Sequence, residues 1–185
     1  MLEKRLFLAV SLPMDLKREL FGIQKEINNQ LEEDFVEAKV FKWVMMENLH
    51  LTLKFIGEVG EKQISEIINN VEQITKNQKS FIIKTKEVCY NDIKKCPCLI
   101  WLTTEKNKDL ENLAKKFDEK KFLGHITLAR IKEWAFKKIE IEERPSVNQE
   151  IKREISVKSI ELMESVLKKT GYEYRIIKSF NFYSK

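Results

Sequence analysis

The sequence predicts an α+β protein whose strands pair mainly antiparallel, and three observations carry this prediction. Segments with strand periodicity alternate with amphipathic helical segments, and several strands follow one another directly, as hairpins require. Both histidines of the chain stand in the same four-residue frame, His50–Leu53 and His125–Leu128. Such a repeat suggests two halves that face one site. No linker rich in glycine, serine or proline divides the chain, so we expect one domain over residues 1–185, made of two lobes.

The chain is expected to open with a strand and a helix. Residues 5–10 form a short apolar run, and Pro13 suits the first turn of the helix that follows. The apolar positions of this helix recur at three- and four-residue steps, at Leu16, Leu20, Ile23 and Ile27. The acidic stretch 32–37 indicates a loop, and 41–44 is a short extended segment leading into the first motif strand, about 49–56.

The middle of the chain predicts a helix and two strands. After Gly60, apolar residues at helical spacing predict a second helix over 64–74. Strands are expected at 80–90 and 98–104, separated by a turn at 91–97.

The last third predicts a helix, the second motif strand and a hairpin. Apolar spacing over 110–117 indicates a third helix, and the second motif strand is expected at 125–131. The stretch that follows gives no clear pattern. Alternation of apolar and polar residues over 150–165 and 172–183, around Lys169-Thr170-Gly171, predicts a closing β-hairpin.

Composition places the chain among soluble globular proteins. Hydrophobic residues make up 43% and charged residues 34% of the sequence. No apolar run is long enough to span a membrane, and Pro13 closes the short apolar start, so we expect a cytoplasmic protein. Lys and Arg exceed Asp and Glu by 34 − 29 = 5, which permits an anionic ligand without requiring one. Three cysteines, at 89, 96 and 98, lack disulfide and zinc-site spacing and are expected to be free thiols.

The two motifs present the same side chains on the same strand face, because side chains on a strand alternate. In the first motif strand the predicted core face carries Leu49, Leu51, Leu53 and Phe55. The opposite face carries His50, Thr52 and Lys54. In the second strand the predicted core residues are Ile126 and Leu128, and the residues facing away are His125, Thr127 and Ala129. Two lobes that bring the polar faces together would form a cleft with two imidazoles and two hydroxyls.

That set of groups suits phosphoryl chemistry. One imidazole can remove a proton from attacking water while the other gives a proton to a leaving oxygen, at roughly 10²–10⁴-fold for each transfer. The hydroxyls can donate hydrogen bonds to the non-bridging phosphate oxygens. The scheme requires no metal. A cyclic or diester phosphate with a ribose oxygen as leaving group would use both histidines.

Two basic residues are further candidates for phosphate contact. Arg130 ends the second motif strand, but strict alternation puts it on the face of Ile126 and Leu128. It must therefore emerge at the strand end or at a bulge, unless it is only a solvated charge that caps the strand. Lys54 is predicted on the same strand face as His50 and Thr52, but it is a weaker candidate, since lysines are common on exposed strand faces.

Other interpretations account for less of the pattern. A single His-x-Thr on a strand is usually an exposed polar pair, and a metal site would need a carboxylate that neither motif has beside it. The three tryptophans, at 43, 101 and 134, have apolar neighbours and are expected in the core. A non-catalytic module is disfavoured because both motifs contain the histidine and the threonine. The sequence contains no Gly-rich phosphate loop and no G-x-S-x-G elbow.

The paired frames resemble those of the two-histidine (2H) phosphoesterases. Within that group the chain is similar to the LigT-like RNA 2′,3′-cyclic phosphodiesterases, historically called 2′-5′ RNA ligases. The resemblance runs nearly from end to end and is carried by residues 5–13, 48–59, 125–130, 162–165 and 171–174. The paired motifs with these flanks are specific, whereas either motif alone would be weak.

This resemblance implies a bilobal α+β fold, with two pseudo-symmetric antiparallel-sheet lobes, helices outside and a central cleft that carries both motifs. It also implies hydrolysis of a terminal 2′,3′-cyclic phosphate on RNA to a 2′-phosphate, without metal or cofactor. The implied partner is RNA with such an end, tRNA fragments among the candidates, and a monomer is the default. The alternatives are 2′-5′ RNA ligation as the reverse reaction, a small cyclic phosphate substrate, and a non-catalytic RNA-end-binding module.

The resemblance also implies residue roles. By position, His50 would protonate the O3′ leaving group and His125 would activate water, although the pseudo-symmetry makes these two roles easy to exchange. The threonines that would hold the phosphate are Thr52 and Thr127. Arg130 would contact the terminal nucleotide, with Phe7 stacking on its base.

Two departures from the family pattern stand out. Gly124 occupies a position where the family usually has proline before the second histidine, which could loosen the start of that strand. The segment Cys96–Trp101 replaces one that often carries arginine after its proline. That difference puts a secondary phosphate contact in doubt.

Overall fold

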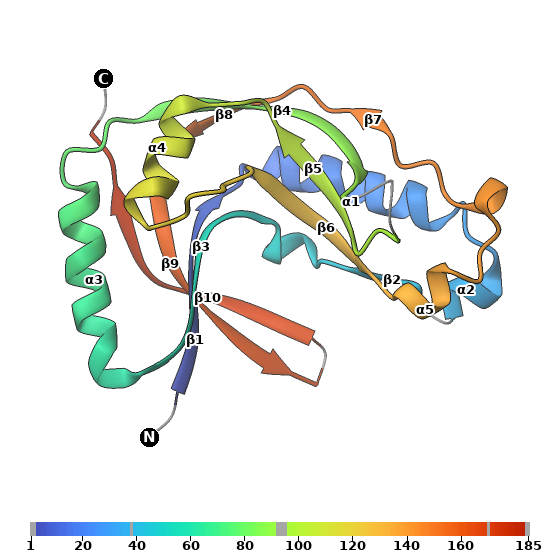
Figure 1. Cartoon of the computed structure of the whole chain (residues 1–185), viewed down its shortest axis with the longest axis horizontal. Coiled ribbons are helices and arrows are strands. Elements are labelled where there is room, and N and C mark those ends of the chain that lie inside the picture. The colour runs from blue at the N-terminus through green and yellow to red at the C-terminus, as the bar shows by residue number, and fades with distance from the viewer. Residues whose placement is uncertain (1–2, 38, 92–95, 170, 184–185) are drawn as a thin grey trace.

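The structure is a computed structural model that describes residues 3–37, 39–91, 96–169 and 171–183. It confirms the α+β class, because its named strands join into one sheet in which every strand pair is antiparallel (Figure 1). The strands are β1 (Glu3–Ser11), β2 (Phe41–Trp43), β3 (His50–Gly60), β4 (Phe81–Tyr90), β5 (Leu99–Thr104), β6 (His125–Ile131), β7 (Gln149–Glu150), β8 (Glu154–Val157), β9 (Ser159–Lys168) and β10 (Gly171–Asn181).

The sheet consists of two halves. Its order is β10-β9-β1-β3-β6-β5-β4-β7, with β2 beside β6 and β8 beside β4. The helices are α1 (Met14–Asn28), α2 (Glu33–Glu37), α3 (Glu61–Thr75), α4 (Lys108–Lys116) and α5 (Glu133–Phe136), with short 3₁₀ helices η1 (Met46–Asn48) and η2 (Ile141–Glu143). Strands β10, β9, β1 and β3 form the first half. The second half comprises β6, β5, β4 and the three short strands attached to them.

The two halves meet at equivalent positions of the two motifs. Between β3 and β6, the described residues form one backbone pair, Leu51 with Ile126. Each is the second residue of its motif, so an approximate twofold axis passes through the pair. Extending this antiparallel register by one residue sets His50 opposite Thr127 and Thr52 opposite His125.

Helix α1 follows β1 in sequence but packs on the second half. Its apolar stripe is buried, as the spacing predicts: Leu16, Leu20, Ile23 and Ile27. The buried amide of Gln24 donates to the carbonyl oxygens of Val44 and Leu128, at 2.9 Å each. Helix α3 packs on β3 and β10 of the first half, on the left in Figure 1. The helices therefore cover the sheet and leave the motif face open.

Two of the sequence-based predictions differ from the structure. The predicted loop at 32–37 contains the helical turn α2, which begins with acidic residues that favour a helix start. The prediction that residues 150–165 form one arm of the hairpin is wrong. Strand β8 ends at Val157 and pairs with β4, and a separate strand β9 then pairs with β10 and β1. The hairpin itself is confirmed, although Thr170 in its turn lies outside the described residues, as do residues 92–95 of the predicted turn at 91–97.

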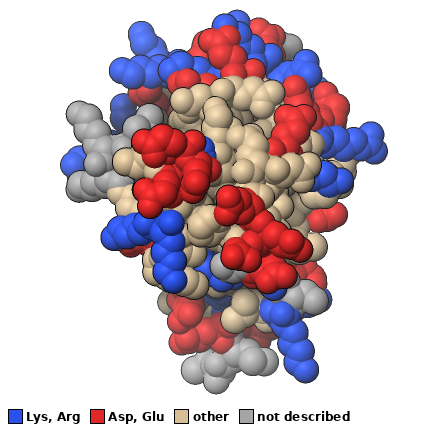
Figure 2. Space-filling model, turned by 90° about the vertical axis from the view of Figure 1, so that its right-hand side faces the viewer, with Lys and Arg blue, Asp and Glu red and all other residues tan. Residues whose placement is uncertain are grey.

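Charged side chains are unevenly distributed over the surface. Figure 2 shows the end of the molecule that carries α2 and α5, where acidic side chains lie around an area of uncharged surface. Trp134 on α5 is 60% exposed, so its predicted place in the core is wrong. No helix within the described part of the chain has both the length and the apolar character needed to cross a membrane.

Candidate active site

The first motif is held by its buried face. Leu49, Leu51 and Leu53 are almost fully buried, which fixes β3 against the core and leaves the intervening polar residues on the other face. There, His50 and Thr52 are half-buried, and the His50 Nε2 lies 2.9 Å from the Thr52 Oγ1. The alternation of the sequence therefore places this pair as predicted.

The second motif repeats the arrangement on β6. Ile126 and Leu128 are fully buried, and His125 and Thr127 are half-buried on the opposite face. The ring centres of His125 and Trp101 lie 4.7 Å apart. Trp101 is the cross-strand partner of Thr127 on β5, so it belongs to the site face and only partly to the core.

Both histidines are oriented by the same backbone contact. The Nδ1 of His50 lies 2.6 Å from the Asn48 carbonyl oxygen, and the Nδ1 of His125 lies 2.8 Å from the Leu123 carbonyl oxygen. A carbonyl oxygen can only accept, so each Nδ1 carries a hydrogen and donates it. Each imidazole therefore leaves its Nε2 available to exchange a proton.

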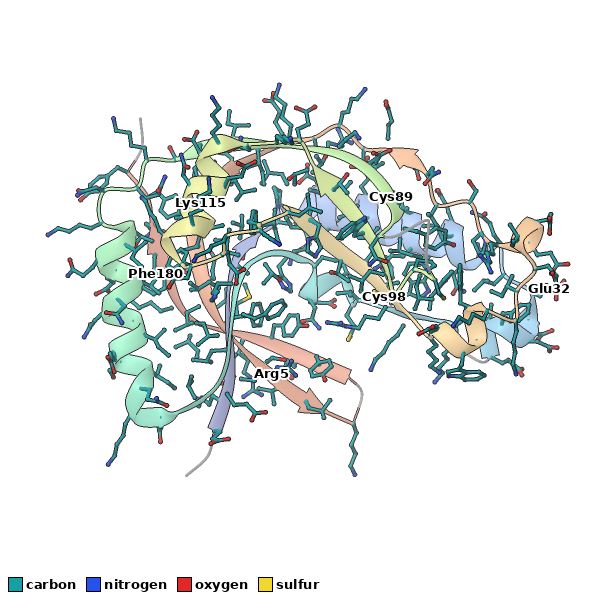
Figure 3. The ribbon with its side chains drawn as sticks, in the orientation of Figure 1. Arg5, Glu32, Cys89, Cys98, Lys115 and Phe180 are labelled. Atoms are coloured by element: carbon teal, nitrogen blue, oxygen red, sulfur yellow. The ribbon has the colours of Figure 1, made fainter. Side chains whose placement is uncertain are left out.

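The site is a cavity of about 530 Å³ between β1, β3, β6, the segment 42–45 and the β9–β10 hairpin. Among its described lining residues are three motif residues, His50, Thr52 and Thr127, and three cations, Arg5, Lys42 and Arg130. None of the described lining residues is an Asp or Glu. Arg5 lies beside the β9–β10 hairpin (Figure 3). His125 does not line the cavity itself, although its charge lowers the pKa of His50, so the two imidazoles lie within electrostatic reach.

Aromatic rings surround His50. Its ring centre lies 5.0 Å from that of Phe7 and 5.2 Å from that of Tyr174, and Phe7 and Tyr174 are themselves 5.0 Å apart. Burial, with smaller contributions from the nearby Lys17 and His125, lowers the pKa of His50 to about 4, despite the favourable contact with the Asn48 carbonyl. His50 is therefore neutral at pH 7 in the free protein.

A β-bulge on β6 turns Arg130 toward the cavity. In the pairing of β5 with β6, Ile100 faces Ala129 and Trp101 faces Thr127, so Leu128 is an extra residue. The alternation reverses after it, and the prediction that Ala129 faces the site is wrong, because Ala129 is fully buried. Arg130 is exposed and lines the cavity, and it emerges at a bulge, one of the two routes expected for it. The carbonyl of Leu128 accepts the Gln24 amide hydrogen bond, which holds the bulge in place.

A bulge on β3 has the converse effect on Lys54 and Phe55. Opposite β1, Ala9 faces Thr52 and Leu8 faces Lys54, so Leu53 is the extra residue. Phe55 was predicted on the core face, but it is 64% exposed and lines the cavity. Lys54 does not line the cavity, and its Nζ lies 3.0 Å from the Glu119 Oε1.

The structure adds residues that sequence reasoning missed. They are Arg5, Lys42, Asn48, Phe55, Trp101, Tyr172 and Tyr174. Tyr172 and Tyr174 alternate on β10 and share its site face, a pattern visible in the sequence. The Asn48 Nδ2 donates to the Tyr172 carbonyl oxygen at 2.6 Å, which ties the hairpin to the first motif. Phe7, which was predicted, lines the cavity but is only 3% exposed.

The cysteines lie away from the cavity and are free thiols, as predicted. Cys89 and Cys98 lie on the side of the molecule formed by β4 and β5 (Figure 3). The Trp101 Nε1 donates to the Cys89 Sγ at 3.2 Å. Within the described residues, no three His, Cys, Asp or Glu side chains are grouped so that they could hold a metal ion.

Comparison with solved structures supports the fold. A protein of Thermus thermophilus superposes with a TM-score of 0.76 at 23% identity, over 96% of this chain and 97% of that one. The E. coli LigT structure with 3′-AMP superposes with a TM-score of 0.73 at 19% identity, over 98% of this chain and 99% of its own.

Comparison with known sequences supports the family. The model of the family described as LigT like Phosphoesterase matches residues 10–95. An Aquifex aeolicus protein named RNA 2′,3′-cyclic phosphodiesterase is 30% identical, over 86% of this chain and 93% of its own length. A Thermotoga maritima protein of the same name is 29% identical over 96% of this chain and 95% of its own. With residues of both motifs lining one cavity and this identity extending over nearly a whole relative, the chain belongs to the LigT-like phosphoesterase family.

Proposed function

We propose that this protein hydrolyses the 2′,3′-cyclic phosphate at the end of an RNA to a 2′-phosphate, by two-histidine acid–base catalysis without a metal. One observation carries the proposal: the Leu51–Ile126 pair brings two His-x-Thr motifs to one site, at a cavity lined by cations and aromatic rings. The Aquifex and Thermotoga relatives bear the name of this activity.

The proposed reaction assigns each proton to an Nε2 atom. His125 accepts a proton from water as the water oxygen bonds to phosphorus, and the bond between phosphorus and O3′ breaks. His50 gives a proton to the departing O3′, so the phosphate stays on O2′. The hydroxyls of Thr52 and Thr127 donate hydrogen bonds to the non-bridging oxygens, where charge accumulates in the transition state.

The environment of His50 constrains its acid role. With a pKa of about 4 it is neutral at pH 7 in the free protein, whereas a general acid must carry a proton. We propose that the anionic cyclic phosphate raises this pKa when it enters, because a nearby negative charge favours the imidazolium form. His50 then takes up its proton on substrate binding.

We propose contacts to the terminal nucleoside from the exposure of the side chains that line the cavity. Arg130 faces the cavity and is free to contact the terminal nucleotide. Phe7 forms the floor beneath it, and the more exposed ring of Phe55 offers the face for base stacking. Lys54, in its ion pair with Glu119, has no place among these contacts.

We further propose that residues 1–185 act as one domain, as a monomer in the cytoplasm, with tRNA fragments among the natural substrates. Small cyclic phosphates remain the alternative substrates, because they present the same phosphate group. Ligation to a 2′-5′ bond remains the alternative reaction, because it is the same phosphate chemistry in reverse. A non-catalytic module is disfavoured, because both Nε2 atoms are oriented for proton exchange.

The test is incubation of the purified protein, in EDTA, with a short RNA ending in 2′,3′-cyclic phosphate, followed by mapping of the product phosphate. We expect a 2′-phosphate, and loss of turnover in His50→Ala and in His125→Ala. RNA binding without turnover would favour the binding module. Activity that depends on added metal, or that persists in either histidine variant, would overturn the proposed mechanism.

A further inference from the structure

We propose that Lys42 and Tyr172 form a subsite for the penultimate nucleotide of the RNA, an inference that rests on the proposed function. Lys42, together with Arg130, binds the phosphodiester on the 5′ side of the terminal nucleoside, and Tyr172 stacks on the penultimate base. The substrate class is therefore an RNA chain of at least two nucleotides.

The first support is an unneutralised pair of cations. Lys42 on β2 and Arg130 on β6 are direct cross-strand partners, and both line the cavity. Like charges directly opposite one another destabilise a sheet. Over the described part of the chain, neither residue forms an ion pair, and no Asp or Glu lines the cavity between them. An anion bound between the two side chains would relieve their repulsion.

The second support is an aromatic ring held beside this pair. The Lys42 Nζ lies 5.7 Å from the centre of the Tyr172 ring, which is half-buried on the cavity side of β10. The carbonyl of Tyr172 accepts from Asn48, two residues before His50, so the backbone that carries this ring is held beside the first motif. Aromatic rings next to cations are the usual means of binding single-stranded RNA without reading its sequence.

The third support is position. His50, Thr52 and Thr127 mark the place of the reacting phosphate. Lys42 on β2 and Tyr172 on β10 line the same cavity from elements other than the motif strands, and the β9–β10 hairpin projects below the rest of the sheet (Figure 1). A nucleoside 2′,3′-cyclic phosphate has one phosphate and fills only the first place. An RNA chain brings a second phosphate, on O5′ of its terminal nucleoside, followed by another base.

The experiment compares kcat/KM for a nucleoside 2′,3′-cyclic phosphate and for a dinucleotide with the same cyclic end. We expect the wild type to prefer the dinucleotide, and Lys42→Ala to lower that preference by about tenfold, as for one lost charged hydrogen bond. The logarithmic salt dependence of kcat/KM for the dinucleotide should weaken by about 0.7 in this variant. Tyr172→Ala should also lower the preference by about tenfold, as for one lost stacked base.

Conservative and control variants separate binding from folding. Lys42→Arg and Tyr172→Phe should keep most of the preference, because they keep the charge and the ring. Lys178→Ala is the matched control: Lys178 also lies over a ring, that of Phe180, but it does not line the cavity. The Lys178→Ala variant should prefer the dinucleotide over the nucleoside cyclic phosphate as strongly as the wild type does.

The outcomes are distinguishable. Equal kcat/KM for both substrates in the wild type, or an unchanged preference in both alanine variants, would overturn the subsite. Failure of the wild type to turn over either substrate would instead overturn the proposed function.

Discussion

Gly124 is a position where a single methyl group should disturb the site. It directly precedes His125, and a Cβ built on it would lie 2.4 Å from the Thr104 Oγ1 and 3.1 Å from the Leu110 Cδ2. Ordinary contacts begin at 3.4 Å, so Thr104 or the start of β6 would have to move by 3.4 − 2.4 = 1.0 Å. Thr104 cannot turn away without cost, because its backbone N and its Oγ1 both donate to the Gly124 carbonyl.

We therefore expect Gly124→Ala to lower both stability and turnover. Overpacking of this kind costs about 1–3 kcal/mol, which corresponds to about 2–12 °C in Tm for a chain of this length. A displacement of about 1 Å at a catalytic group can reduce the rate by about 10²-fold, so kcat should fall by about 10- to 100-fold.

The assay is a double-mutant cycle with Thr104→Ala, measured by urea unfolding and by kcat. Thr104→Ala removes the Oγ1, so Gly124→Ala should cost much less in that background, with a coupling of at least about 1 kcal/mol. Gly22→Ala is the matched control: it lies inside α1 with no atom within 4 Å of its Cβ, and should stabilise by about 0.5–1 kcal/mol. Additive effects in the cycle, or a fully stable and active Gly124→Ala, would refute this reasoning.

Three further predictions concern residues around the motifs. Because the pKa of His50 is lowered to about 4, the unfolded chain binds the extra proton between pH 6.5 and 4. As the pH is lowered from 6.5 to 4, the free energy of unfolding should therefore decrease by about 3 kcal/mol more in the wild type than in His50→Gln, as measured by urea unfolding. Gln24→Leu should destabilise by about 1–3 kcal/mol, by loss of two buried hydrogen bonds, and should raise KM more than it lowers kcat, because it loosens the bulge that orients Arg130; an unchanged KM would contradict this. Trp101→Ala should lower kcat by about tenfold, on the scale of a misplaced catalytic group, whereas Trp101→Phe, which keeps a ring against His125, should retain most of it; equal losses in the two variants would argue against positioning of the imidazole by that ring.

The motif residues could be placed from the sequence because alternation holds while a strand is regular. It predicted the faces of His50, Thr52, His125 and Thr127, and the structure agrees. Each of these residues lies before the first bulge of its strand, so simple alternation along the sequence still predicts which face its side chain occupies.

Beyond the bulges the same counting fails. Phe55 and Ala129 each follow an extra residue, so each lies on the face opposite to the one predicted. A bulge is defined by the register of the partner strand, which the local sequence does not contain. The contribution of Lys42 and Tyr172 was missed for a related reason, since their contact joins segments far apart in the chain.

The crossing of α1 from one half of the sheet to the other has a consequence for how the protein is made. The first half needs both β1 and β10, which are more than 150 residues apart in sequence, while the second half needs α1, which is made between β1 and β3. Neither half is therefore complete in a contiguous stretch of sequence. A nascent chain that has not reached residue 171 still lacks the strand that supplies Tyr172 and Tyr174, so the cavity acquires this wall only after β10 has been synthesised.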